Sequence, residues 1–254
     1  APETKVPVLF VVDGDLVFGM AAEIARAMSS VGGIPAHYVV GIGYDAGYAE
    51  FLKLRTADLT PPLGAAAGEA MGALGAMIGS DRNGGADVFL AFLIERLMPE
   101  IAARYPGTAG GEQILFGHSL GGLFAAHALL TRPESFSSYI ISSPSLWWDG
   151  FSILRQLPEW AARLAGLPRQ PRIFVDVGGK EQDPPTHVPP ELGATLEEAR
   201  AQVIACRMVD AATEFAGALA SAGATDMRHI VFAEDDLVAA DHLARAIADG
   251  VGSG

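Results

Sequence analysis

The glycine-rich segment at residues 117–122 constrains the fold more than any other part of this chain. It places Ser119 between Gly117 and Gly121, after an apolar run at residues 113–116 and before a helical pattern at residues 123–130. A serine at a sharp turn from strand to helix holds its Oγ exposed and strained, beside backbone amides that can receive an oxyanion. Small residues are needed there because the strand and the helix pass close together. The pattern predicts a nucleophile elbow with Ser119 as the nucleophile.

Composition favours one globular enzyme-sized domain. The chain has 254 residues, of which 50% are hydrophobic, so we expect a single α/β domain over residues 1–254. Its 17 basic and 30 acidic residues give a net charge of -13, which would repel nucleic acid and anionic membrane surfaces. The apolar run at residues 6–12 is far shorter than the ~20 residues of a membrane-spanning helix, so we expect a soluble chain.

The sequence leaves the cellular compartment and the oligomeric state of the chain open. The chain begins with Ala1 rather than Met and shows no signal peptide, which leaves its compartment undecided. The lone Cys206 excludes a disulfide within one chain and fits a small buried position in a helical pattern. Nothing in the sequence indicates an oligomeric state.

Short β-rich runs alternate with helical patterns along the whole chain. This alternation predicts an α/β fold with a mainly parallel central sheet and helices on both faces. The expected strands lie at residues 6–12, 38–42, 114–116, 138–141, 173–177 and 229–232. The expected long helices cover residues 86–105, 195–219 and 237–249.

Two segments are predicted to be loops near the site. Residues 61–85 are rich in Gly and Ala and form either a cover over the site or an ordinary surface loop. Residues 178–193 hold four prolines between a strand and a long helix, so we expect an irregular loop that carries the catalytic acid.

A nucleophile elbow of this type requires an acid and a histidine later in the chain. The acid is expected where the strand at residues 173–177 ends, and Glu181 is the first candidate and Asp183 the second. A solvated surface acid in a loop is an equally good interpretation of either one. No metal and no organic cofactor is implied.

Several segments together resemble the putative-esterase branch of the α/β-hydrolase superfamily. This branch includes siderophore (enterobactin-type trilactone) esterases and is related to S-formylglutathione hydrolases, feruloyl esterases and mycolyltransferases. The resemblance covers most of the chain and, beyond the elbow, rests on residues 8–14, 41–44, 55–61, 84–87 and 143–148. It implies an α/β-hydrolase fold and cleavage of a small-molecule carboxylic ester through an acyl-Ser119 intermediate.

The resemblance also implies roles for individual residues. The oxyanion donors would be the backbone N–H of Leu120 and one N–H from the Gly14-Asp15 turn. Substrate contacts would come from four side chains, with simple loop packing as the alternative for the two tryptophans. These side chains are Trp147 and Trp148, which would wall the acyl side, Tyr44 and Arg55.

The sequence departs from the family at two places. The family begins with an antiparallel hairpin before the strand that matches residues 6–12, and this chain starts almost at that strand, so we expect the hairpin to be missing. The family also places its catalytic histidine in a Glu-Asp-His-like turn after the last strand. Here the turn at residues 232–237 carries Asp236 in the histidine's place.

The six histidines offer few substitutes for the missing base. His242 has the correct chain order, but it reaches the mouth of the last helix only if that helix begins at Asp241 rather than near Leu237. His187 lies in the irregular loop and could swing toward Ser119. The other four are expected to lie too far away or on the wrong side: His37 opens an early strand, His118 and His127 flank the elbow, and His229 begins the last strand.

Three functions follow from these alternatives. With His242 as base, the chain is a serine esterase. With Asp236 in the base position, the chain is a catalytically impaired hydrolase-fold binding protein, because a carboxylate of pKa about 3.9 has little driving force to take the serine proton. The third function, acyl transfer to an alcohol or amine, uses the same elbow and cannot be separated from hydrolysis by sequence.

Overall fold

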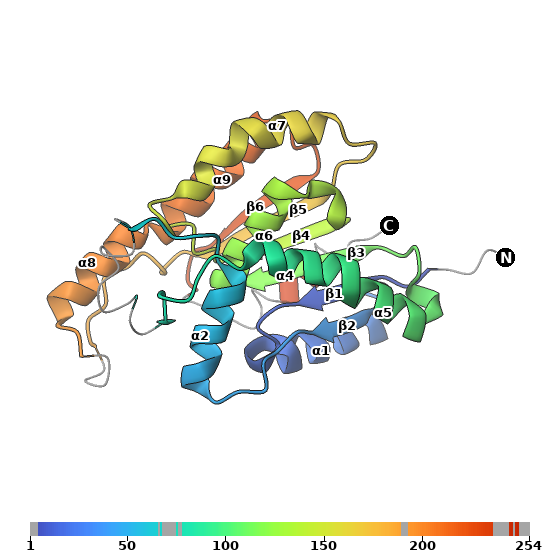
Figure 1. Ribbon diagram of the computed structural model, residues 1–254, viewed down its shortest axis with the longest axis horizontal. Helices are drawn as coiled ribbons and strands as arrows, with labels where there is room; N and C mark the ends of the chain where they lie inside the picture. Colours follow the sequence, from blue (N-terminus) through green and yellow to red (C-terminus); the bar gives the residue numbers. More distant parts are fainter. Residues whose placement is uncertain are drawn as a thin grey trace.

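The computed structural model describes residues 5–65, 67, 75, 78–188, 193–235, 244, 245, 247 and 248. Its strands form one six-stranded sheet in the order β2-β1-β3-β4-β5-β6, and every neighbouring pair is parallel (Figure 1). The strands are β1 (Val8–Val11), β2 (Tyr38–Gly41), β3 (Gln113–His118), β4 (Ser138–Ser142), β5 (Arg172–Gly178) and β6 (Met227–Phe232). The predicted parallel sheet is therefore confirmed.

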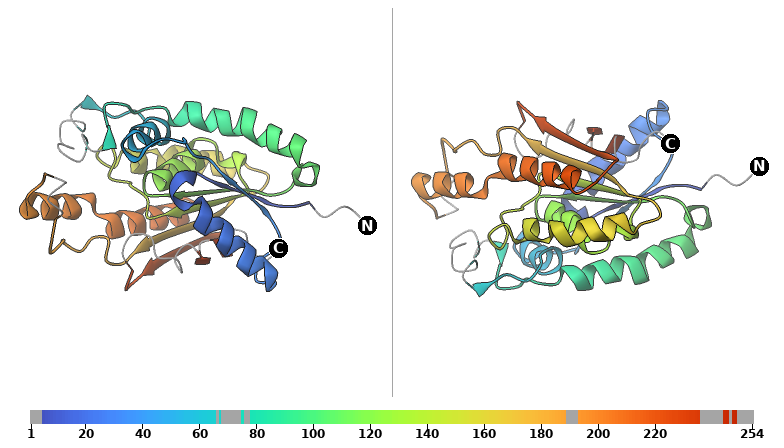
Figure 2. Two further views of the ribbon diagram at one scale, coloured as in Figure 1. Left: turned by 90° about the horizontal axis from the view of Figure 1, so that it is seen from below. Right: turned by 90° about the horizontal axis from the view of Figure 1, so that it is seen from above.

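The inner strands are apolar because both of their faces are covered. Every residue of β1 and of β4 is buried, as expected for parallel strands enclosed by helices. On one face, α1 (Gly14–Ser30) packs through Val17 and Ala21, and Ile247 joins the same cluster. The opposite face holds a larger core against α4, α6, α7 and α9 (Figure 2). These helices and their neighbours are α2 (Tyr48–Leu59), α4 (Ala86–Phe92), α5 (Met98–Arg104), α6 (Leu120–Thr131), α7 (Leu157–Ala165), α8 (Leu196–Cys206) and α9 (Met208–Ser221).

The helix predicted at residues 86–105 is confirmed, with one irregularity. A π-helical turn, η1 (Leu93–Leu97), connects α4 to α5. The turn directly precedes Met98 and Pro99, the first two residues of α5. Proline has no N–H to donate to the preceding turn, so the wider turn lets the helix continue through it. Three short 3-10 turns complete the described elements: η2 (Pro106–Thr108), η3 (Pro133–Ser135) and η4 (Ser152–Gln156).

The single helix predicted at residues 195–219 is wrong. α8 begins at a capping box, in which the Thr195 side chain accepts from the Glu198 N–H and the Glu198 carboxylate accepts from the Thr195 N–H. It ends at Cys206, because the left-handed backbone of Arg207 (φ 46°, ψ 42°) cannot continue a helix, and α9 begins at Met208. The C-terminal helix predicted at residues 237–249 lies largely outside the described residues.

The two predicted loops are described to different extents. Residues 179–188 form no helix or strand, which confirms the irregular loop for that part. Of residues 61–85, Pro61 and Gly64 are bonded to the turn after β4: Trp148 Nε1 donates to Pro61 O (3.0 Å) and Gly64 N–H donates to Asp149 Oδ1 (2.9 Å). Residues 66, 68–74, 76 and 77 lie outside the described residues, and the segment's role as a cover stays a prediction. No helix among the described residues is long and apolar enough to cross a membrane.

Candidate active site

The candidate site lies where the parallel strands end. The chain runs from β1 to β2 on one side, then returns to place β3 on the other side of β1. Ligands of open α/β sheets bind at the carboxyl ends of the strands, beside such a reversal. Here the reversal brings the turn after β1, which contains Gly14 and Asp15, beside the turn after β3, which contains Ser119.

The turn at Ser119 has the predicted strand-to-helix geometry. Ser119 holds φ 59° and ψ -117° between β3 and α6, a sparsely populated conformation for a residue with a side chain. A Cβ on Gly117 would lie 1.9 Å from the Gly121 carbonyl oxygen, and one on Gly122 would lie 2.6 Å from the Ser142 carbonyl oxygen. Only glycine fits at these two positions, which confirms the close approach expected of the segment.

The loop after β4 contacts Ser119 directly. Ser119 N–H donates to Ser142 O (3.1 Å), Ser145 N–H donates to Ser119 O (3.0 Å), and the two hydroxyl oxygens of Ser119 and Ser145 lie 3.4 Å apart. The Ser119 side chain is part-buried, whereas Ser145 is almost fully buried. From the sequence, Ser145 was named only within segment 143–148, which carries the family resemblance. Its contact with Ser119 was not predicted.

Glu181 is the acid candidate that the structure brings to the carboxyl edge. Its Oε1 accepts from the Ser143 hydroxyl (2.5 Å) and from Gly178 N–H (2.8 Å), so the carboxylate is held at the end of β5 beside the loop after β4. Asp183, the second candidate, is exposed, and its N–H donates to Lys180 O. This geometry favours Glu181, and Ser143 is a further contact that sequence reasoning missed.

None of the histidines in the described part of the chain has a recorded hydrogen bond with Ser119. His127 Nε2 lies 2.8 Å from Asp87 Oδ1, and His118 Nδ1 lies 3.3 Å from Ser142 Oγ. His229 was expected at the start of the last strand, but it lies inside β6 in register with Val175. His187 is exposed. Both candidates for the base, His242 and Asp236, lie outside the described residues.

Of the two N–H groups predicted as oxyanion donors in the turn after β1, one is already engaged within the protein. Gly14 N–H donates to Ile42 O (2.8 Å), so Gly14 is wrong as a donor for substrate. Asp15 follows it in the first turn of α1, where helix N–H groups lack intrahelical partners. Among the described residues, neither Asp15 N–H nor Leu120 N–H has a recorded acceptor. These two amides remain the candidate donors, one from each turn at the reversal.

Arg55 is buried in an ion pair instead of being open to a substrate. Its Nε donates to Asp13 Oδ1 (2.8 Å) and its Nη2 donates to Asp13 Oδ2 (2.6 Å). The two side chains are only 9% and 4% exposed. The predicted substrate contact by Arg55 is therefore unsupported, because its guanidinium is engaged within the protein.

Tyr44 lies beside this pair. Burial, followed by the charges of Asp58 and Asp13, raises the pKa of the Tyr44 hydroxyl well above its ordinary value. Burial also raises the pKa of Asp58, while its hydrogen bond with Tyr44 opposes that rise. Tyr44 is thus a neutral hydrogen-bonding group, and its predicted contact with substrate stays a prediction.

The two tryptophans differ in their surroundings. Trp148 is 1% exposed, and its indole N–H donates to Pro61 O, so its predicted role as a wall of the substrate site is wrong. Loop packing, the alternative interpretation, accounts for it. Trp147 is part-buried and packs against the larger core cluster, and it retains surface that a substrate could contact.

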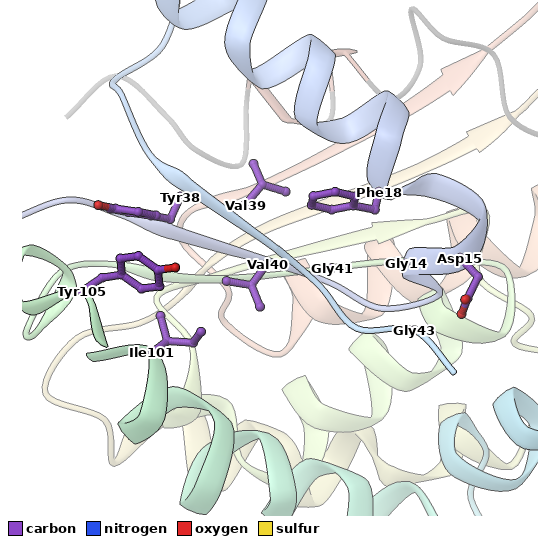
Figure 3. Close-up of a pocket in the computed structure, with 10 residues that line it drawn as sticks. All are labelled: Gly14, Asp15, Phe18, Tyr38, Val39, Val40, Gly41, Gly43, Ile101 and Tyr105. Atoms are coloured by element: carbon purple, nitrogen blue, oxygen red, sulfur yellow. The ribbon is translucent and has the colours of Figure 1, made fainter. Parts of the chain in front are cut away.

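An open groove follows the outer side of β2 to the same turn. It has a cavity volume of about 370 Å³ and runs from the Tyr38–Tyr105 pair at one end to Gly14, Asp15 and Gly43 at the other (Figure 3). Phe18 lies over Gly41 in its middle, where a Cβ would lie 2.6 Å from the Phe18 ring. The described residues that line the groove include no histidine or serine.

The fold and the turn geometry define an α/β-hydrolase-type protein. One solved structure similar to it is the siderophore hydrolase EstA from Aspergillus nidulans, with a TM-score of 0.76 and 28% identity over 97% of this chain and 83% of that chain. The chain belongs to the family described as "Putative esterase", whose family model matches residues 1–218.

Two curated relatives carry more specific names. A siderophore triacetylfusarinine C esterase from Aspergillus fumigatus is 39% identical over 186 residues, which cover 70% of this chain and 58% of that protein. A siderophore enterobactin esterase from Emericella nidulans is 36% identical over 189 residues, 69% of this chain and 58% of that protein. The chain thus spans less than two thirds of the length of these relatives.

Proposed function

We propose that this protein is a serine hydrolase that cleaves a carboxylic ester through an acyl-Ser119 intermediate. One observation carries the proposal. Ser119 is held in a strained turn at the reversal of the sheet, where the N–H groups of Leu120 and Asp15 have no recorded acceptor among the described residues. A nucleophile with two preorganised donors beside it is the arrangement that acyl transfer requires.

The steps follow from these groups. Ser119 Oγ attacks the ester carbonyl as the base takes its proton, and the oxyanion forms next to Leu120 N–H and Asp15 N–H. The alcohol leaves with the proton, and water then repeats the sequence to release the acid and free Ser119. Glu181, held by Ser143 and Gly178, would orient and charge-stabilise the base. We assign the base to His242.

The relatives suggest the class of ester. Both curated relatives are named as siderophore esterases, one for triacetylfusarinine C and one for enterobactin. We therefore propose that the substrate is a siderophore ester. Part-buried Trp147 and Tyr44 are the candidate side chains for contact with it.

Turnover of a small p-nitrophenyl ester and of a trilactone siderophore tests this function. Replacing the nucleophile, Ser119→Ala, should lower kcat by about 1000-fold or more, whereas Ser221→Ala at the exposed end of α9 should leave turnover unchanged. In the same assay His242→Ala should cause a large loss. A gain from Asp236→His would instead mean that the base was lost at Asp236. Turnover that survives Ser119→Ala would sink the proposal.

A further inference from the structure

Asp13 has an unusual partner for a residue at the start of a helix. It is the N-cap of α1, yet its side chain makes no capping hydrogen bond. An N-cap aspartate usually accepts from the backbone N–H groups of the first helical turn. Here both carboxylate oxygens accept instead from Arg55 on α2, 42 residues later in the chain.

The carboxylate of Asp13 also contacts the turn that follows Ser119. A Cβ on Gly121 would lie 3.1 Å from Asp13 Oδ2, so the carboxylate lies against the first turn of α6. Asp13 is two residues before Asp15, and Gly121 is one residue after Leu120. The buried ion pair therefore lies between the two turns that carry the candidate oxyanion donors.

A buried carboxylate at this place would oppose catalysis if its charge were not balanced. Negative charge develops on the substrate carbonyl oxygen in the transition state, and a second negative charge nearby in a water-poor site repels it strongly. The Arg55 guanidinium supplies the opposite charge in a bidentate geometry, which also fixes the Asp13 side chain. Asp13 itself holds a left-handed backbone (φ 56°, ψ 39°), so this contact helps to maintain the turn that orients Asp15 N–H.

We propose that Arg55 is a positioning residue for the oxyanion hole, and that it acts through Asp13 instead of by contact with substrate. The inference rests on the proposed ester hydrolysis at Ser119. In this proposal the buried Asp13–Arg55 pair affects the rate of the chemical step. Buried ion pairs contribute little net stability compared with apolar replacements, so stability alone gives no reason for a charged pair at this place.

The test compares five forms of the full chain: Arg55→Gln, Arg55→Lys, Asp13→Asn, the double variant Asp13→Asn/Arg55→Gln, and Arg82→Gln. The last is the matched control, because Arg82 forms an exposed pair with Glu50, also on α2, with side chains 53% and 50% exposed. For each form, kcat and KM for an activated ester are measured together with thermal unfolding. Hydrogen exchange of peptides covering residues 12–20 gives a readout that does not depend on activity.

Arg55→Gln should lower kcat about 100-fold with KM within about threefold, similar to loss of one oxyanion donor. Arg55→Lys, which keeps the charge but not the bidentate fork, should lose less, about tenfold. The neutral double variant should be faster than Arg55→Gln, because no unbalanced carboxylate remains. Exchange at residues 12–20 should be faster in Arg55→Gln than in the wild type and unchanged in Arg82→Gln.

Other outcomes would contradict either the role of Arg55 or the proposed function, and they can be told apart. A rise in KM at constant kcat for Arg55→Gln would mean direct contact with substrate, and a double variant no better than Arg55→Gln would exclude the charge-balancing role. Unchanged exchange at residues 12–20 would overturn the positioning role whatever the activity. If the wild type turns over no ester while exchange changes as expected, the proposed function fails but the structural role of the pair stands.

Discussion

At the scale of single residues, strained backbone conformations cluster at the carboxyl edge of the sheet. Asp13 (φ 56°), Ser119 (φ 59°) and Ser143 (φ 41°) follow three adjacent strands. Each such conformation costs a residue with a side chain about 1 to 3 kcal/mol, so the surroundings must hold it. Arg55 holds Asp13, backbone bonds to Ser142 and Ser145 hold Ser119, and Ser143 N–H donates to Asp176 O (2.8 Å). Strain maintained at three neighbouring turns is typical of a functional site.

Gly117 tests the close packing beneath Ser119. Gly117→Ala should lower the free energy of unfolding by about 3 kcal/mol or more, because the obstructing atom is backbone and cannot rotate away. Gly19→Ala in α1 is the matched control: a Cβ there meets nothing within 4 Å, and an alanine within a helix should stabilise by up to about 1 kcal/mol. Urea unfolding measures both. Equal stability of the two variants would contradict the packing described for this turn.

Asp58 should make stability depend on pH. Burial raises the pKa of its carboxyl in the folded protein, so its ionisation favours the unfolded chain as the pH rises above about 3.9, the ordinary value. Asp58→Asn removes this cost and keeps an acceptor for Tyr44. The variant should be more stable than the wild type at pH 8, and the difference should vanish near pH 3.5. Urea unfolding at pH 8, 6 and 3.5, with exposed Asp226→Asn as control, checks the sign. A constant difference across this range would contradict the assignment.

Local sequence patterns predicted where the candidate site residues lie better than they predicted the contacts between those residues. The position of Ser119 at a strand-to-helix turn was predictable because the glycines that it requires lie within three residues, and the position of Glu181 at the end of β5 because an apolar run precedes it. The contacts of Ser119 with Ser145 and of Asp13 with Arg55 were not predictable, because they join segments 26 and 42 residues apart. Burial of Trp148 was only the alternative interpretation for the same reason: its partner, Pro61, is 87 residues away.

At the scale of elements, the sequence predicted strands well and the break between two consecutive helices poorly. All six strands were expected; the inner ones form short continuous apolar runs because both of their faces are covered, whereas the edge strands β2 and β6 have no fully buried residue. The division between α8 and α9 depends on the backbone of one residue, Arg207, which is an ordinary helix former by propensity. Its guanidinium forms ion pairs with Glu214 and lies over the Phe151 ring, and both contacts belong to the tertiary structure.

The same division predicts unequal local stability. α8 has no fully buried residue and stands away from the body of the molecule in Figures 1 and 2, whereas 11 residues of α6 are buried. Helices without buried contacts open at low free-energy cost. Amide hydrogen exchange should therefore be fast throughout α8 and slowest in α6, with α9 between them. Protection of α8 equal to that of α6 would contradict this arrangement.

At the scale of the whole molecule, the sheet assembles a site from distant parts of the chain. The turns after β1, β3, β4 and β5 all lie at one edge of the sheet because the strands are parallel. Asp13 and Glu181, which are far apart in the sequence, therefore lie at the same edge. The family could be recognised from the sequence because each of its motifs is a short continuous segment, and two of them, residues 8–14 and 143–148, include the turns after β1 and β4. The base could not be assigned from sequence because it depends on where the last helix begins.

The proposed function requires that Ser119 is an activated nucleophile. Incubation of the full chain with a fluorophosphonate, followed by intact-mass and peptide mass spectrometry, tests this claim most directly. We expect one adduct per chain, located on Ser119 and formed at least about 100-fold faster than any adduct on Ser119→Ala. An unlabelled wild type, or equal labelling of Ser119→Ala, would contradict it.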